Sequence, residues 1–274
     1  MTDARTSDLA AYLDRIGVPD ATTPDLATLR RIVTAHATTI PFEGLDPFTG
    51  IEPGIDPDAV TAKLVRGGRG GWCYEHNSLL RHSLDALGFR TTGLAGRVRW
   101  MLPEDTPPTS RTHMLLRVEL PEGTFLADVG FGGMTPTGVL ALEPDVEQET
   151  PLEPYRLHRD GDTWTLHARA DRWRPLYTFE LLPAPQIDYE MGNWYLAHHP
   201  SSPFRSALIA ALPGADRRRA LNGRSFTVHH LGGPSKRQEL ESPGEIRDVL
   251  ETEFGIDTAV VPGLDNRLAA LFRT

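Results

Sequence analysis

The chain has 274 residues, enough for one large domain or two to three small ones with a buried core. Hydrophobic residues make up 39% and charged residues 24%, as in ordinary globular proteins and unlike disordered ones. The 28 basic and 37 acidic residues give a net charge of −9, with no long basic run, which argues against nucleic acid as the main partner. Residues 1–6 lack the layout of a secretory signal, and no stretch approaches the roughly 18 apolar residues of a membrane span. We therefore expect a cytoplasmic protein that binds neither nucleic acid nor membrane.

Cysteine and histidine usage limits the kinds of site that the chain can build. Cys73 is the only cysteine, which excludes an internal disulfide and a zinc site made of several cysteines. The adjacent pairs His198-His199 and His229-His230 would point to opposite faces of a strand, and no carboxylate stands at a familiar ligand spacing. We therefore expect no metal.

The first ninety residues predict helices, because apolar residues recur at helical spacing in four segments. The start and stop signals are Asp8 with Gly17, Thr23-Pro24, Asp56-Pro57, and Cys73 with Gly88. A late helix is predicted from Ser242-Pro243, where Glu245 stands at the capping-box position, to Gly255.

Strands are predicted between these helical regions. Residues 113–120 alternate in polarity, Pro121-Glu122-Gly123 breaks the run, and residues 125–129 form the return strand. Asp160-Gly161 predicts a hairpin turn between strands 155–158 and 164–167, and residues 176–181 predict a further strand. Helices followed by an antiparallel sheet or barrel, and then a mixed C-terminal segment, indicate an α+β fold.

The densest chemical signal is the segment 69–77 around Cys73. Gly70 and Gly71 let the backbone turn sharply into a helix that begins near Cys73. The free N–H groups and positive dipole at a helix N-terminus favour the thiolate and can hold an oxyanion. Most free cysteines are simply small buried hydrophobes, so this segment alone leaves both interpretations open.

A nucleophilic cysteine needs a base and a group that orients the base. His113 points away from the apolar face of its strand, and Asp128 lies on the return strand. A tight loop near residues 120–122 would place Asp128 on the same face as His113, directly opposite or diagonal to it. A looser loop would separate the two residues, and an ordinary strand-edge histidine with a strand-end cap remains the alternative.

Three glycines surround Phe131 directly after Asp128, in the segment 130–133. Such a segment lets backbone N–H groups approach a phosphate. It is neither a Walker loop nor a dinucleotide fingerprint, so on its own it indicates no more than a turn.

Together these motifs resemble the arylamine N-acetyltransferase family. The segment 69–77 resembles the active-site signature of that family, and four further blocks follow the family's order. These blocks are Ile40-Pro41-Phe42-Glu43, Thr112-His113, Asp128 with Val129-Gly130-Phe131-Gly132, and Asn193-Trp194-Tyr195 with Pro200. The resemblance runs from about Leu9 to Phe254. Two departures are Glu43-Gly44-Leu45, where the family often has Glu-Asn-Leu, and Ala197-His198-His199-Pro200, where it often has Ser-Thr-His-Pro.

The resemblance implies a papain-like triad of Cys73, His113 and Asp128. It also implies an N-terminal helical bundle that carries the nucleophile (1–92), a β-barrel that carries His113 and Asp128 (93–195), and an interdomain segment with an α/β lid (196–274). By position, the acyl and aryl pocket would contain Phe42, Val98, Phe131 and Phe204, and the coenzyme A contacts would be Trp100, Thr112, Gly130, Gly132 and Gly133.

The implied reaction is ping-pong transfer of an acetyl group from acetyl-coenzyme A, through acyl-Cys73, to an arylamine or arylhydrazine. Three alternatives stay open. An amide synthase that closes a polyketide macrolactam would use the same triad with a carrier-protein donor. A papain-like peptidase is disfavoured by the single cysteine and the missing signal segment, and a binding module with a vestigial triad is disfavoured because all three members are present. The oligomeric state is open.

Overall fold

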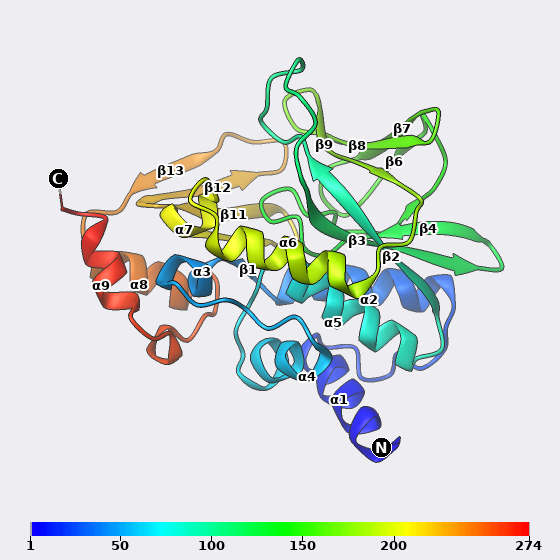
Figure 1. The fold of residues 1–274 in the computed structure, drawn as a ribbon, viewed down its shortest axis with the longest axis horizontal. Coiled ribbons are helices and arrows are strands. Elements are labelled where there is room, and N and C mark those ends of the chain that lie inside the picture. Colours follow the sequence, from blue (N-terminus) through cyan, green and yellow to red (C-terminus); the bar gives the residue numbers. More distant parts are fainter. Residues whose placement is uncertain (1, 274) are drawn as a thin grey trace.

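The computed structural model describes residues 2–273, which form helices and two antiparallel sheets (Figure 1). The helices are α1 (Thr2–Arg15), α2 (Leu26–Thr39), α3 (Leu45–Thr49), α4 (Pro57–Val60), α5 (Cys73–Ala86), α6 (Gln186–His198), α7 (Pro203–Ser206), α8 (Pro243–Thr252) and α9 (Leu264–Ala270). A π-helical segment, Thr61–Arg66, continues α4, and a 3₁₀ turn spans Thr258–Val260. Among the described residues, no helix has the length and apolarity needed to cross a membrane.

The larger sheet has eight strands in the order β5-β4-β3-β2-β9-β8-β7-β6 and curls into a nearly closed barrel. Its strands are β2 (Arg90–Val98), β3 (Arg111–Leu120), β4 (Gly123–Ala127), β5 (Leu140–Ala141), β6 (Glu147–Gln148), β7 (Tyr155–Asp160), β8 (Thr163–Arg169) and β9 (Trp173–Glu180). The α+β class with an antiparallel barrel is therefore confirmed.

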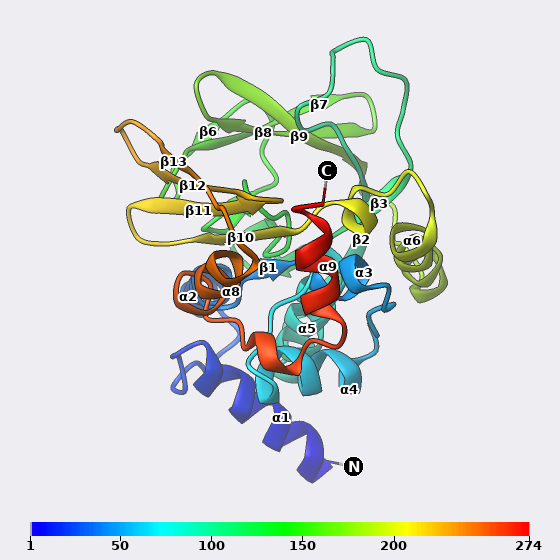
Figure 2. The ribbon, with the colours of Figure 1, turned by 90° about the vertical axis from the view of Figure 1, so that its left-hand side faces the viewer.

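The smaller sheet joins one strand from the N-terminal part of the chain to four strands from the C-terminal part, in the order β1-β10-β11-β12-β13. Its strands are β1 (Phe42–Glu43), β10 (Ile209–Pro213), β11 (Arg217–Asn222), β12 (Ser225–His230) and β13 (Lys236–Glu239). Strands β11–β13 lie with α8 and α9 on one side of the molecule, and the N-terminal helices lie beneath the larger sheet (Figures 1 and 2). The pairing of Phe42 with Ala211 brings the segment before α3 next to this C-terminal layer.

The start signals at the helices are mostly correct. Asp56 caps α4 and Ser242 caps α8, each through its side-chain oxygen, as predicted. The predicted cap at Thr23 is wrong, because Asp25 accepts the Thr28 N–H at 2.8 Å and α2 begins at Leu26. Helix α1 begins at Thr2, well before the predicted signal at Asp8.

Strand β3 separates two hydrophobic cores. Met114, Leu116 and Val118 face the core of the N-terminal helices, whereas Leu115 faces the interior of the barrel. His113 shares the face of Leu115, because side chains alternate along a strand. Packing of the apolar residues on both faces thus fixes which way His113 points.

Candidate active site

Cys73 is the first residue of α5, and the turn before it tolerates only glycine at one position. A Cβ on Gly70 would lie 1.9 Å from the Pro41 carbonyl oxygen, so no larger residue fits. The Glu75 carboxylate accepts the Trp72 N–H at 3.0 Å and caps the helix. Cys73 is 7% exposed, and its thiol donates to the Thr112 carbonyl oxygen at 3.5 Å. The nucleophile candidate therefore sits at a fixed helix N-terminus beside the start of β3.

His113 lies between Asp128 and Cys73. Its Nε2 is 2.7 Å from Asp128 Oδ2, and the Cys73 side chain lies close enough to the ring to help raise the pKa of His113. Because Asp128 occupies Nε2, Nδ1 is the ring nitrogen left for sulfur. Burial opposes the charged form of His113, but Asp128 outweighs it and raises the pKa of His113 to about 10. Burial alone would raise the pKa of Asp128, yet the pairing with His113 lowers it.

The hairpin register explains how His113 and Asp128 meet. The loop is tight, since Leu120 pairs with Gly123, and the ladder continues to the pair Leu116–Ala127. The prediction that Asp128 lies on the return strand is wrong, because β4 ends at Ala127. Continued by one residue, the register sets Asp128 opposite Leu115 and hence diagonal to His113, one of the two predicted arrangements.

Asn77 holds Asp128 in place, and no role was predicted for it. Its Nδ2 donates to Asp128 Oδ1 at 3.0 Å and to the Met114 carbonyl at 2.8 Å, while its Oδ1 accepts the Val129 N–H at 3.2 Å. The signal in the sequence is its position four residues after Cys73, on the same face of the helix. Asn77 therefore connects the nucleophile helix to the carboxylate.

Aromatic side chains lie against the two residues that flank the nucleophile, Trp72 and His113. The Phe131 ring meets His113 edge-on at 5.2 Å, and the Phe42 and Phe204 centroids lie 6.0 Å apart. Phe204 also packs edge-on against Trp72, the residue before the nucleophile. Phe42 and Phe204 are therefore in contact, and Phe131 lies beside them, because its neighbour Gly132 lies against the Phe42 ring. The fourth predicted pocket residue, Val98, pairs with Tyr177, whose ring lies against His113 at 4.7 Å.

The glycine-rich segment 130–133 passes directly against the nucleophile. A Cβ on Gly130 would lie 2.8 Å from the Cys73 Cα, and the Gly130 N–H already donates to Asp128 Oδ1 at 3.0 Å. Gly132 has a φ of 82° and lies against the Phe42 ring. Across residues 2–273, the N–H groups of Gly132 and Gly133 have no hydrogen-bond acceptor. Two of the three predicted glycines therefore keep donors available for a ligand.

Trp100 and Thr112, the other predicted coenzyme A contacts, lie near the ends of β2 and β3. Trp100 is half-buried against the barrel core, which Phe131 also contacts. Thr112 presents its carbonyl to the Cys73 thiol. Thr112 therefore contacts the candidate nucleophile, whereas Trp100 is placed only against the barrel core.

A buried chain of hydrogen bonds supports the pocket wall that Phe42 forms. The Pro41 carbonyl can only accept, so His76 Nε2 donates to it at 3.2 Å. His76 Nδ1 then accepts from His36 Nε2, and His36 Nδ1 accepts from the Tyr12 hydroxyl, both at 2.9 Å. Burial lowers the pKa of His76 to about 4, which keeps this ring neutral. The His76 ring also stacks on Phe42 at 6.3 Å and thereby fixes the pocket wall.

Comparison with known proteins gives the family of the chain. A family profile described as N-acetyltransferase matches residues 25–261. The arylamine N-acetyltransferase of Mycolicibacterium smegmatis is 45% identical over 94% of this chain and 95% of its own length. The chain belongs to the arylamine N-acetyltransferase family.

A more distant member of the arylamine N-acetyltransferase family and solved structures of the family are also similar to this chain. The Escherichia coli arylamine N-acetyltransferase is 38% identical over 89% of this chain and 87% of its own length. The structure of the Mycobacterium marinum arylamine N-acetyltransferase superposes with a TM-score of 0.93 at 43% identity, over 97% of this chain and all of that one. A second structure of that protein, in complex with CoA, gives a TM-score of 0.91 at 44% identity, over 96% of this chain and 98% of that one.

Proposed function

We propose that this protein transfers an acetyl group from acetyl-coenzyme A to the nitrogen of an arylamine or arylhydrazine, with acetyl-Cys73 as intermediate. The observation that carries the proposal is the line of Cys73, His113 and Asp128 at the N-terminus of α5. The names of the relatives support the substrates, and the M. marinum complex supports coenzyme A as the donor's carrier. We also propose a cytoplasmic location, where the single cysteine would stay reduced.

In the first half-reaction, the Cys73 thiolate attacks the thioester carbonyl carbon. The N–H groups in the first turn of α5 have no intrahelical acceptor and can stabilise the oxyanion. The bond from carbon to the coenzyme A sulfur then breaks, and the His113 imidazolium gives its proton to the leaving thiolate. Cys73 is left acetylated, and His113 is left neutral.

In the second half-reaction, the amine nitrogen attacks the acetyl-Cys73 carbonyl. Neutral His113 takes the proton from the nitrogen, the bond to sulfur breaks, and the amide leaves. Arylamines suit this step because they are largely uncharged, and therefore nucleophilic, near pH 7. The Phe42, Phe131 and Phe204 rings would exclude the water that hydrolyses the thioester.

Intact mass spectrometry tests the donor and the intermediate together. We expect one acetyl adduct per chain after mixing with acetyl-coenzyme A, and loss of that adduct when an arylamine is added. Cys73→Ser should give no adduct under the same conditions, because its hydroxyl is far harder to ionise. An unmodified wild-type mass would contradict the proposal and would favour a carrier-protein donor.

The segment 130–133 is proposed to receive the coenzyme A phosphates. A Cβ on Gly133 would have no atom within 4 Å, so a side chain there points into open space. Gly133→Asp is expected to raise the KM for acetyl-coenzyme A about tenfold, because a negative charge close to a phosphate is unfavourable. The isosteric, uncharged Gly133→Asn is the control and should change KM little. Equal KM values for the two variants would mean that the phosphates bind elsewhere.

A further inference from the structure

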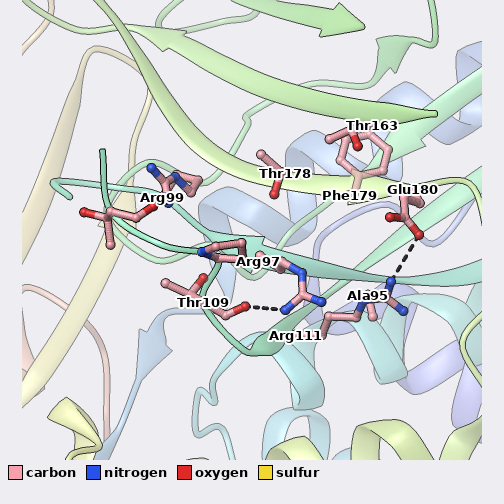
Figure 3. Close-up of a pocket in the computed structure, with 11 residues that line it drawn as sticks. Ala95, Arg97, Arg99, Thr109, Arg111, Thr163, Thr178, Phe179 and Glu180 are labelled. Carbon is pink, nitrogen blue, oxygen red and sulfur yellow. Dashed lines mark hydrogen bonds and ion pairs between the residues drawn. The ribbon is translucent and has the colours of Figure 1, made fainter. Parts of the chain in front are cut away.

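A basic trough lies outside the barrel, beneath the segment 99–110 that connects β2 to β3. Two cavities, of about 810 Å³ and about 440 Å³, share Arg99 and Thr178 in their linings and therefore adjoin. Figure 3 shows the smaller cavity, with Arg97, Arg99 and Arg111 around it. The six arginines of the trough are Arg97, Arg99, Arg111, Arg156, Arg172 and Arg174.

The trough is separate from the candidate active site. Tyr177 and Thr178 are neighbours on β9 and point to opposite faces of the sheet. Tyr177 packs against His113 inside the barrel, whereas Thr178 lines both cavities outside it. The thickness of the sheet therefore lies between the trough and the triad candidates.

The positive charge of the trough is poorly balanced. Among the residues that the structure describes, only Glu104 and Glu180 line it as carboxylates; Glu180 is paired with Arg111 at 3.1 Å, and Arg174 is paired with Asp171 at 2.6 Å. Within residues 7–273, no carboxylate lies within 4 Å of the guanidinium of the other four arginines. These are Arg97, Arg99, Arg156 and Arg172, of which Arg97 and Arg99 donate to backbone carbonyls of the segment 99–110. Such an excess of cations is unexpected on a chain of net charge −9.

Two of the lining side chains have buried donors or acceptors without partners. Arg156 on β7 pairs across the ladder with His167 on β8, and both line the larger cavity. Arg156 Nε and His167 Nδ1 are buried and form no hydrogen bond within the described residues. The Arg156 guanidinium is held 4.7 Å above the Trp173 ring, which orients it. An anionic ligand in the cavity would give such groups the partners that buried polar atoms require.

We propose that the trough binds a small molecule that carries a diphosphate or triphosphate group. Guanidinium groups match phosphate oxygens in pairs, and Arg156 and Arg172, which line the larger cavity without a carboxylate or carbonyl partner among the described residues, suit a polyphosphate. Trp173, Met101 and Leu102 also line the larger cavity and offer apolar contacts to a base or sugar. Segment 99–110 lies over the trough, and the volume of the larger cavity suits a nucleotide. A free nucleotide and coenzyme A carry the same diphosphate chemistry, and the experiment below distinguishes them.

Calorimetric titration with tripolyphosphate, at low salt, tests the site directly. We expect saturable binding of one anion per chain, weakened at least about tenfold in Arg156→Gln and in Arg172→Gln. Arg172 is exposed, so its variant will fold even if Arg156→Gln does not. Arg90→Gln is the matched control, since this 82% exposed side chain on β2 lies outside the trough, and its affinity should stay unchanged.

Two further measurements identify the source of the phosphate. If coenzyme A is the ligand, which rests on the proposed function and would place its phosphates in the trough instead of at segment 130–133, Arg172→Gln will raise the KM for acetyl-coenzyme A but not for a short acetyl thioester without phosphates. If a free nucleotide is the ligand, Arg172→Gln will weaken ATP binding and leave both KM values unchanged. Absence of saturable tripolyphosphate binding, or equal affinities in Arg172→Gln and Arg90→Gln, would overturn the proposal. The titration needs no turnover, so it remains decisive even if Cys73 is never acetylated.

Discussion

Asp128→Asn is expected to slow acetyl transfer at least about a hundredfold while the protein remains folded. The Asp128 carboxylate accepts from the His113 ring at 2.7 Å and from the Asn77 amide and the Gly130 N–H at 3.0 Å each. An asparagine fills the same volume but carries no charge, and its NH₂ group cannot accept the ring N–H. His113 would then prefer the tautomer that places its hydrogen toward Cys73, where a lone pair is needed.

A pH profile separates this role from a purely structural one. Asp128 is what raises the pKa of His113 to about 10 against the effect of burial, so in Asp128→Asn that pKa should fall. The imidazolium that stabilises the Cys73 thiolate would then be lost at lower pH than in the wild type. We therefore expect iodoacetamide to alkylate Cys73 more slowly at pH 7 in the variant. A rate and a profile like those of the wild type would contradict the assignment.

Asp145→Asn is the matched control for this variant. Asp145 forms the same kind of pair with His158, with 2.7 Å between the atoms, but both side chains are exposed. Asp145 has a φ of 62°, a conformation that asparagine adopts readily. Acetyl transfer should therefore stay close to the wild-type rate. A large loss in both variants would show that the assay reports stability and not catalysis.

The parts of the fold that local chemistry determines were predictable from the sequence. Ser242 with Glu245 identifies the start of α8, and the turn after Leu120 identifies the hairpin of β3 and β4. The placement of His113 and Asp128 on one face follows from that hairpin, because the register of a tight loop is fixed. The sequence left the tightness of the loop open, and the structure shows that the loop is tight, since Leu120 pairs with Gly123.

The C-terminal layer was not predictable in the same way. Its strand β11 contains the buried Arg218, which is 3% exposed and is paired with Glu153 across the molecule. A charged residue on the buried face removes the alternation by which a strand is identified. Strand β13, Lys236–Glu239, is exposed along its whole length and carries no apolar pattern. These strands depend on contacts distant in sequence, which periodicity cannot reveal.

Helix α6 was missed for a related reason. Ile187, Met191 and Trp194 are exposed, while Tyr189 and Leu196 are buried, so apolar residues lie on both sides of the helix. A helix without one apolar face has no clear period in its sequence. The role of Asn77 was missed because its partner, Asp128, becomes a neighbour only through the tertiary fold.

A buried ion network beneath the nucleophile predicts a large effect on stability. Lys63 Nζ lies 2.6 Å from Asp46 and 2.8 Å from Glu75, and Arg69 pairs with Asp46 and Glu43. The Glu75 side chain is 1% exposed and is the group that caps α5 at Trp72. Removal of one cation therefore leaves a buried carboxylate uncompensated, directly beside the turn into Cys73.

We expect Lys63→Met to lower the free energy of unfolding by about 3–5 kcal/mol, measured by urea denaturation near pH 8. The cost arises because methionine fills the space of the lysine chain but leaves Glu75 and Asp46 without Nζ. Arg31→Met is the control: Arg31 is 2.7 Å from Asp20, but the two side chains are 48% and 71% exposed. Loss of this exposed pair should cost no more than about 1 kcal/mol. Equal costs in the two variants would mean that burial of the network contributes nothing.

The destabilisation of Lys63→Met should also depend on pH, in a direction that the Glu75 carboxyl determines. Burial raises the pKa of Glu75 from 4.5 to about 7, although Lys63 opposes this shift. Without Lys63 the pKa should rise further, so the folded variant binds more protons than the unfolded chain above pH 4.5. Its stability must then increase as the pH falls from 8 toward 5, as Glu75 is neutralised, and the difference from the wild type should shrink. A difference that grows toward pH 5 would show that Glu75 is not the carboxylate left uncompensated.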